Sequence, residues 1–227
     1  MTAGKGIVHS EMFPMVNTDS DNPTELFQIW LNLPSQDKMV DPYFTMFWED
    51  SVQTMDVVDD VGLYSSVQVV AGKFKETTAP APPPNSWASR SESDLAIWSI
   101  RMQANANLTL PPAKEGTNRV LYFFNGAALL LNGVQCSVKH AFQVRPTDAI
   151  KLENGDQEAE ILVLQGRPIG EPVAKYGPFV MNTQQELQQA YQDYQRTQFG
   201  GWPWSGRDPA HNSEGRFAIH ADGKVER

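Results

Sequence analysis

Every apolar run in this chain is short, and glycine or proline interrupts the sequence throughout. The 227 residues include 16 glycines and 16 prolines, and the stretches between them are rich in β-branched and aromatic residues. Many short strands with frequent turns are typical of a β-sandwich or β-barrel rather than of alternating β–α units. We therefore expect an all-β fold. The predicted strands are 24–33, 52–58, 64–71, 95–102, 120–124, 129–131 and 161–164.

Three Asn-Gly pairs lie beside these apolar runs and predict turns. They are Asn125-Gly126, Asn132-Gly133 and Asn154-Gly155. Asn and Gly both tolerate positive φ, which the tightest hairpin turns require. Each pair therefore predicts a hairpin or another tight turn.

One segment, 183–199, has the periodicity of a helix. Its apolar or aromatic residues recur at i, i+3, i+4 and i+7, which predicts a single apolar face. Thr183 and Glu186 fit a capping box, and Gly200 with the glycine after it predicts the stop. We interpret the segment as an amphipathic helix packed on the protein's own sheet, with a partner-binding helix as the alternative. The apolar positions are Leu187, Ala190, Tyr191 and Tyr194.

A proline-rich stretch, 77–84, divides the sequence. Proline lacks the backbone donor that a central strand needs, so the stretch predicts an extended linker. The alternative is a ligand for proline-recognising modules. The predicted division is 1–79 as the remainder of a first β domain, 80–90 as linker, 91–166 as a second β domain, and 167–227 as a helix with a return segment and tail.

Composition narrows the classes of function. The formal net charge is −9, which argues against direct binding of nucleic acid. The longest apolar runs are far shorter than the roughly 20 residues that span a bilayer, and residues 1–10 lack the apolar stretch of a secretory signal. We expect an intracellular protein that is cytoplasmic, with the nucleus open, and that has no membrane partner.

The sequence lacks the short motifs that mark a catalytic nucleophile or a phosphate-binding loop. It contains neither a Gly-x-Ser-x-Gly elbow nor a phosphate-binding glycine loop of the Walker type. Cys136 is the only cysteine, and we interpret it as a small core residue rather than a nucleophile. We expect His140, His211 and His220 each to be structural or solvent-facing.

His9-Ser10-Glu11 is the strongest candidate for chemistry. In an extended chain, side chains at i and i+2 point to the same face, so an imidazole and a carboxylate can converge on one ion. Borderline metals such as Fe(II) accept this mixture of donors. We predict His9 and Glu11 as metal ligands, although two donors alone do not hold a metal firmly.

The residues around this pair resemble the signature of the pirin family. Residues 2–11 read Thr-Ala-Gly-Lys-Gly-Ile-Val-His-Ser-Glu, against the family's Thr-Ala-Gly-x-Gly-Ile-x-His-Ser-Glu. Further matching blocks occur in the family's order near both ends of the chain, so the resemblance covers essentially all of it. These blocks are Leu26-Phe27-Gln28-Ile29-Trp30-Leu31-Asn32-Leu33-Pro34, Asp37-Lys38-Met39, Pro168-Ile169-Gly170-Glu171-Pro172 and Tyr176-Gly177-Pro178-Phe179-Val180-Met181-Asn182-Thr183.

The resemblance implies a bicupin, with two antiparallel β-barrels and a mononuclear iron in the first. Family members bind this Fe(II) with three histidines and one glutamate. His9 and Glu11 match the last two ligands, whereas the upstream His-x-His has no counterpart here. The resemblance therefore implies a first barrel that is incomplete, with Met1 matching an internal methionine of the family. The causes left open are an internal start, a partial gene model and a fragment.

The second barrel can be compared with the general cupin pattern, in which a glutamate stands seven residues before a glycine. With Gly126 as that glycine, the glutamate position is Arg119, and the preceding histidine positions fall within 112–115. None of these residues is a metal ligand of the expected type. We therefore expect the second barrel to be metal-free and to act as scaffold or interaction surface.

The family resemblance implies two functions. One is quercetin 2,3-dioxygenase-type activity on a flavonol-like small molecule, with Glu11 as both ligand and catalytic base. The alternative is an iron-dependent, redox-sensing transcription cofactor that acts through protein partners, which the acidic charge suits better than bare DNA. Because only two of four ligands match, we expect substoichiometric iron and weak or no turnover in this chain. A third possibility is that it has neither function.

Overall fold

The computed structural model describes residues 1–13, 15–202, 205, 216–220 and 222–227. These residues form two compact units. Unit 1 combines residues 1–46 with 171–227, and unit 2 comprises residues 47–170. No helix within the described part of the chain is both long and apolar enough to cross a bilayer.

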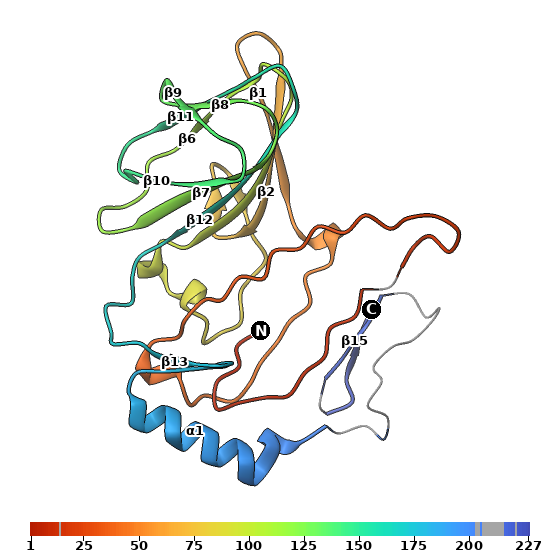
Figure 1. Cartoon of the computed structure of the whole chain (residues 1–227), viewed down its shortest axis with the longest axis vertical. Coiled ribbons are helices and arrows are strands. Elements are labelled where there is room, and N and C mark those ends of the chain that lie inside the picture. The colour runs from red at the N-terminus through yellow and green to blue at the C-terminus, as the bar shows by residue number, and fades with distance from the viewer. Residues whose placement is uncertain (14, 203–204, 206–215, 221) are drawn as a thin grey trace. The chain divides into compact units, whose positions relative to one another are not determined.

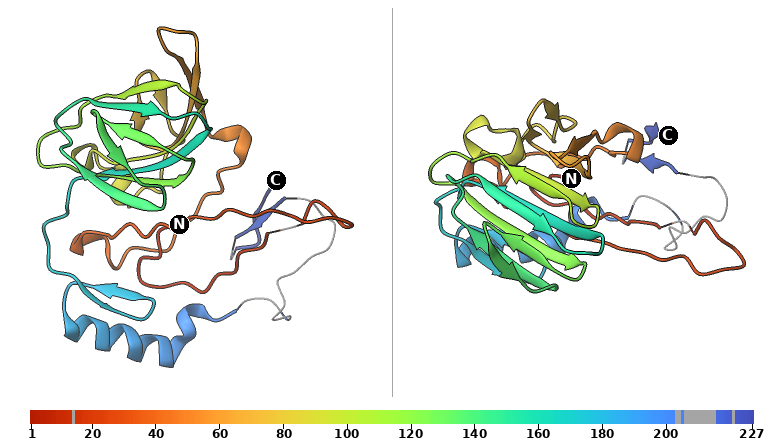
Figure 2. Two further views of the ribbon diagram at one scale, coloured as in Figure 1. Left: turned by 45° about the horizontal axis from the view of Figure 1, so that its top comes forward. Right: turned by 90° about the horizontal axis from the view of Figure 1, so that it is seen from above.

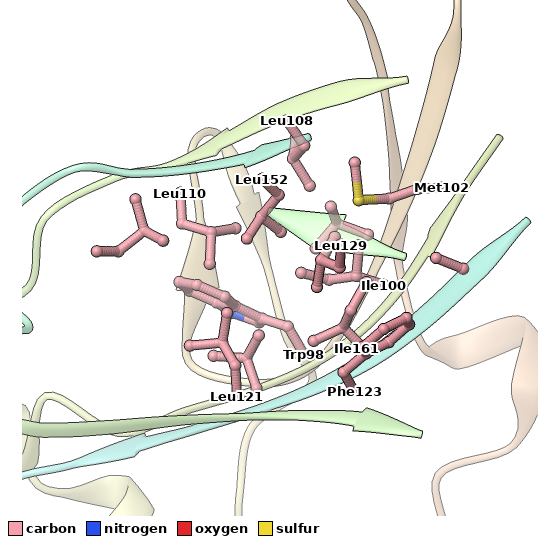
Figure 3. Packing of buried hydrophobic residues seen from close by; sticks show 14 of the residues in the cluster. Trp98, Ile100, Met102, Leu108, Leu110, Leu121, Phe123, Leu129, Leu152 and Ile161 are labelled. Atoms are coloured by element: carbon pink, nitrogen blue, oxygen red, sulfur yellow. The ribbon is translucent and has the colours of Figure 1, made fainter. Parts of the chain in front are cut away.

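Unit 2 contains two antiparallel sheets that face each other across a common core (Figures 1 and 3). Its strands are β1 (Thr54–Val58), β2 (Tyr64–Ala71), β3 (Lys73–Phe74), β4 (Thr77–Thr78), β5 (Ala96–Met102), β6 (Asn107–Leu110), β7 (Asn118–Asn125), β8 (Leu129–Leu131), β9 (Val134–Cys136), β10 (His140–Val144), β11 (Ile150–Asn154) and β12 (Ala159–Gly166), and its 3-10 helices are η2 (Glu49–Ser51), η3 (Trp87–Ser89) and η4 (Ser91–Ser93). One sheet has the order β1-β2-β5-β12-β7-β10 and the other β6-β11-β8-β9.

Alternation along the strands accounts for the core of unit 2. In β5, the side chains of Ala96, Trp98, Ile100 and Met102 are buried, whereas the residues between them are more exposed. Successive side chains of a strand point to opposite faces, so this pattern directs one face of β5 inward. Figure 3 shows Trp98, Ile100 and Met102 among leucines that the opposite sheet contributes. The structure confirms six of the predicted strands. They are the strands at 52–58, 64–71, 95–102, 120–124, 129–131 and 161–164.

The Asn-Gly pairs had different outcomes. Asn132 and Gly133 have φ of 49° and 79° and form the two-residue turn that joins β8 to β9, as predicted. Gly126 has φ of 129° in the turn after β7. Of the two alternatives predicted for Asn154-Gly155, the hairpin is excluded, because the strands on either side, β11 and β12, belong to different sheets. The side-chain amide of Asn154 instead donates through Nδ2 to the backbone carbonyl oxygen of Gln103 at 2.8 Å.

The proline-rich segment 80–90 lies inside unit 2. It follows the short β3–β4 hairpin and precedes β5. Strands β1 and β2, which come before this segment, extend the sheet of β5, because β2 pairs with β5 in antiparallel register. The strand pairing thus joins residues on both sides of the predicted linker into one sheet.

Unit 1 has little regular structure apart from one helix. Its elements are η1 (Ser35–Asp37), β13 (Ala174–Tyr176), β14 (Phe179–Met181), α1 (Gln184–Thr197), η5 (Gln198–Gly200), β15 (Ala218–Ile219) and β16 (Val225–Glu226). Helix α1 packs along the β13–β14 hairpin, as both Figure 1 and Figure 2 show. An isolated bridge between Thr2 and Tyr43 completes the described pairing.

The sequence predicts α1 well at its start and less well at its end. Thr183 accepts from the Glu186 amide, and the Glu186 carboxylate accepts from the Thr183 amide at 2.7 Å, which confirms the capping box. Leu187 on the predicted apolar face is buried. The helix stops before Gly200, because Gln198 takes the left-handed C-cap conformation. The α-helix itself thus ends two residues before the predicted bound, and the 3-10 turn η5 continues to Gly200, where Gly201 is the C-cap.

The predicted strand at 24–33 is wrong. The structure has no strand there, and Leu26 and Trp30 are 61% and 56% exposed. The residues suit a strand, but a strand also needs a neighbour to satisfy its backbone groups. Among the described residues, no strand pairs with this segment.

Candidate metal centre

The chain that leads to the candidate ligands is anchored at two glycines. The amides and carbonyls of Thr2 and Tyr43 pair reciprocally at 2.7 and 3.0 Å, and the Lys5 amide donates to the Val40 carbonyl at 2.9 Å. Gly4 has φ of 51°, and a Cβ at this position would collide with the Val40 carbonyl oxygen. Only glycine combines this φ with this closeness of approach.

Gly6 is the second anchor, and it lies against an aromatic ring. Its φ is 115°, and a Cβ there would lie 2.6 Å from the Phe199 ring. The ring also packs edge-on against Phe179, with centroids 5.7 Å apart, and contacts Tyr194 at 5.2 Å. The two glycines of the Thr-Ala-Gly-Lys-Gly signature therefore have a physical role, which is to let the chain pass close to its neighbours.

His9 and Glu11 lie on the same side of the chain that follows. The His9 Nε2 and Glu11 Oε1 atoms are 3.7 Å apart, and the two side chains are 45% and 61% exposed. No regular strand includes them, although the i, i+2 spacing places both side chains on one face as an extended chain does. The pair can present one imidazole nitrogen and one carboxylate to the same ion.

The donor set around this pair is small. Within the described ranges, no group of three or more His, Cys, Asp or Glu side chains is arranged to hold a metal ion. His9 and Glu11 fit half of a four-donor mononuclear site in the chemistry of their atoms and in their separation. Without a metal the pair is an exposed ion contact, which contributes little to stability.

Unit 2 has a guanidinium where the general cupin pattern has a glutamate ligand. Arg119 is 1% exposed, and its Nε donates to the Gln165 Oε1 at 2.8 Å. Its Nη1 donates to the Pro111 carbonyl at 2.9 Å, and the guanidinium lies 5.6 Å from the Trp98 ring centroid. Burial lowers the pKa of Arg119, an effect that the charge of Asp94 opposes. This polar cluster lies at the start of β7, at the position that the general cupin pattern gives to the glutamate.

The structure describes three of the remaining candidates, which are Cys136, His140 and His220. Cys136 is buried, and burial raises the pKa of its thiol, so the core interpretation is confirmed. His140 is exposed on β10, and its Nδ1 lies 3.0 Å from the Val138 carbonyl. His220 stacks on Phe44, with centroids 4.0 Å apart. His211 lies outside the described residues.

Two carboxylates of unit 1, those of Glu226 and Glu171, have interaction partners that the sequence did not indicate. Glu226 lies 3.0 Å from His220 Nε2, because the β15–β16 hairpin brings the two residues together. The Glu171 carboxylate accepts from the Ser35 backbone amide at 2.6 Å and from the Asn182 side-chain amide, Nδ2, at 2.9 Å. The Ser35 backbone donor is the largest of several contacts that lower the pKa of Glu171. The residues of these pairs do not stand at a short, regular spacing in the sequence, so no local pattern predicts the contacts.

Comparison with known proteins gives a consistent result. Residues 97–200 match the family model for the pirin C-terminal cupin domain. A pirin-like protein of Caulobacter vibrioides is 33% identical over 199 residues, which is 88% of this chain and 66% of the relative. Pirin-1 of Arabidopsis thaliana is 29% identical over 204 residues, or 88% of this chain and 64% of the relative. The chain thus spans somewhat less than two thirds of these relatives.

A solved structure agrees with the sequence relatives. The crystal structure of quercetin 2,3-dioxygenase from Acinetobacter baumannii superposes with a TM-score of 0.63 at 27% identity. The match covers 75% of this chain and 55% of that one. The described fold, mostly β with one helix, is therefore a cupin fold.

Proposed function

Because this chain belongs to the pirin family of cupin proteins, we propose that His9 and Glu11 bind Fe(II) in a centre of the quercetin 2,3-dioxygenase type. The observation that supports the proposal is the 3.7 Å approach of His9 Nε2 to Glu11 Oε1, with both side chains open to solvent. An imidazole and a carboxylate on one face are the donors that non-haem Fe(II) accepts.

The proposed reaction needs a binding site and a base. Bound Fe(II) would supply a Lewis acid for the oxygens of a flavonol-like substrate and for dioxygen. Glu11 is 61% exposed, so its carboxylate can reach a substrate hydroxyl and accept its proton. The name of the Acinetobacter relative supports the substrate class.

Iron binding by this chain should be weak. The described residues provide two donors, and affinity falls steeply as donors and the groups that orient them are lost. We expect substoichiometric iron after purification and negligible turnover of quercetin. Full occupancy by iron at His9 and Glu11 would contradict this expectation.

The experiment compares Glu11→Ala with Glu25→Ala, which removes another exposed carboxylate from unit 1. Anaerobic titration with Fe(II) should show binding in the unchanged chain and in Glu25→Ala, and its loss in Glu11→Ala. Oxygen consumption with quercetin, with and without added Fe(II), tests the activity. If Glu11→Ala binds Fe(II) as well as the unchanged chain, Glu11 is not a ligand.

A second function, iron-dependent contact with protein partners, is favoured by a different observation. Apolar side chains of unit 1, among them Leu26, Trp30 and Leu31, are 39% to 61% exposed. Exposed apolar side chains that gather on a surface commonly mark protein contacts. Pull-down with the iron-loaded and iron-free chain, and with Trp30→Ser, tests this function. Equal recovery of partners in all three would exclude it.

A further inference from the structure

The turn that follows α1 has an uncommon backbone. Four successive residues have positive φ, with values of 50°, 50°, 90° and 71° from Gln198 to Gly201. Glycine adopts such angles freely, but Phe199 has a bulky side chain, for which the left-handed region is a genuine outlier. Conformations of this kind persist where the surroundings fix them, and they occur preferentially near functional sites.

Three residues of the chain surround the Phe199 ring. Phe179 and Tyr194 pack on one part of its ring, and Gly6 lies against the ring itself. All four residues belong to unit 1. Because a Cβ on Gly6 would come within 2.6 Å of the ring, the contact allows no side chain at that position. The left-handed turn thus holds the ring against the chain just before the candidate ligands.

Gly6 is also the last described backbone anchor before the pair. The Gly6 amide donates to the Ala3 carbonyl at 2.9 Å. Among the described residues, no further backbone hydrogen bond outside helices and strands involves residues 7–13. His9 follows Gly6 by three residues, so the direction that the chain takes from Gly6 sets where the imidazole and the Glu11 carboxylate point.

We infer that Phe199 is a positioning residue for the His9–Glu11 pair, and that its ring sets the path of the chain at Gly6 and so the alignment of the two donors. The inference rests on the proposed function for its chemical meaning. The left-handed turn after α1 then has a role beyond ending the helix, which is to place the Phe199 ring against Gly6.

The test uses three variants of the full chain. Phe199→Gly removes the ring and suits the left-handed backbone, so the turn is preserved. Phe199→Tyr retains the ring. Tyr176→Ala removes another ring of the same aromatic group, one that packs on Tyr191 and is 69% exposed, and serves as the control. Co(II) is the metal probe, titrated by calorimetry, and amide NMR of residues 7–11 in the metal-free chain is the second measurement.

Loss of groups that orient metal ligands typically lowers affinity about 10- to 100-fold. We expect Phe199→Gly to weaken Co(II) binding at least about tenfold and to shift or broaden the amide signals of 7–11, whereas Phe199→Tyr and Tyr176→Ala do neither. In a Glu11→Ala background, the effect of Phe199→Gly on Co(II) binding should disappear, because the two changes act on one site.

Unchanged amide signals at 7–11 in Phe199→Gly would overturn the inference, as would equal losses of Co(II) affinity in Phe199→Gly and Tyr176→Ala. The proposed function fails by a different result, namely equal Co(II) binding by the unchanged chain and Glu11→Ala. In that case the metal-free NMR comparison still decides whether Phe199 positions the pair.

Discussion

Units 1 and 2 differ in how their apolar residues are used. In unit 2, residues such as Phe123 and Leu152 are fully buried between two sheets. In unit 1, the apolar stretch 24–33 has no partner strand among the described residues, and it exposes Leu26 and Trp30. Apolar content alone therefore does not produce a buried core, because the backbone of a strand must also pair with a neighbouring strand. The candidate metal ligands lie in the unit with less regular pairing.

The largest expected effect comes from the core of unit 2. Phe123→Ala should lower the free energy of unfolding by about 3–5 kcal/mol, because it leaves a cavity in a closed core. Leu26→Ala, at an exposed position of unit 1, should change it by less than about 0.5 kcal/mol. Urea denaturation followed by circular dichroism measures both. Similar losses in the free energy of unfolding for the two variants would show that apolar side chains contribute equally to stability in the two units.

An intermediate effect is expected inside the polar cluster of unit 2. Gln165→Leu removes the acceptor for Arg119 Nε and leaves a buried guanidinium without that partner. We expect a loss of about 2–3 kcal/mol, because unsatisfied buried donors cost more than exposed ones. Gln143→Leu on β10, a surface position, is the control. Equal midpoints for the two leucine variants in urea would show that the Arg119 contact contributes nothing.

The smallest effect concerns a local feature of unit 1. Thr183→Ala removes the N-cap of α1 and should cost about 1 kcal/mol. Thr183→Ser retains the hydroxyl and should restore most of the loss. Amide hydrogen exchange in the first turn of α1 is the appropriate measurement, because the change should be confined there. Faster exchange throughout unit 2 as well would mean that the two units unfold together.

The sequence predicted those parts of the fold that local patterns determine. The strand 64–71 and the capping box at Thr183 follow from alternation and from short-range spacing. The 24–33 segment could not be predicted correctly from its own residues, because its state depends on whether another strand lies beside it. The same limit applies to Asn154-Gly155, whose flanking strands separate into different sheets.

The candidate site shows the same division between local and distant information. Spacing alone placed His9 and Glu11 on one face, since both belong to a single extended stretch. Phe199 could not be found in this way, because its contact with Gly6 joins opposite ends of the sequence and its left-handed backbone has no sequence signal. A bulky residue in that region costs about 1–2 kcal/mol, so the structure that holds it there must compensate.

The buried guanidinium of Arg119 has a consequence for how unit 2 could change. A divalent cation that approached this end of β7 would meet a fixed positive charge, whose repulsion is strong where water is excluded. Substituting glutamate would place a carboxylate beside the side-chain Oε1 of Gln165 and the backbone carbonyl of Pro111, which now accept from Arg119. Converting this part of unit 2 into a metal centre would therefore require changes at several of these positions together, because Arg119→Glu alone leaves three acceptors facing one another.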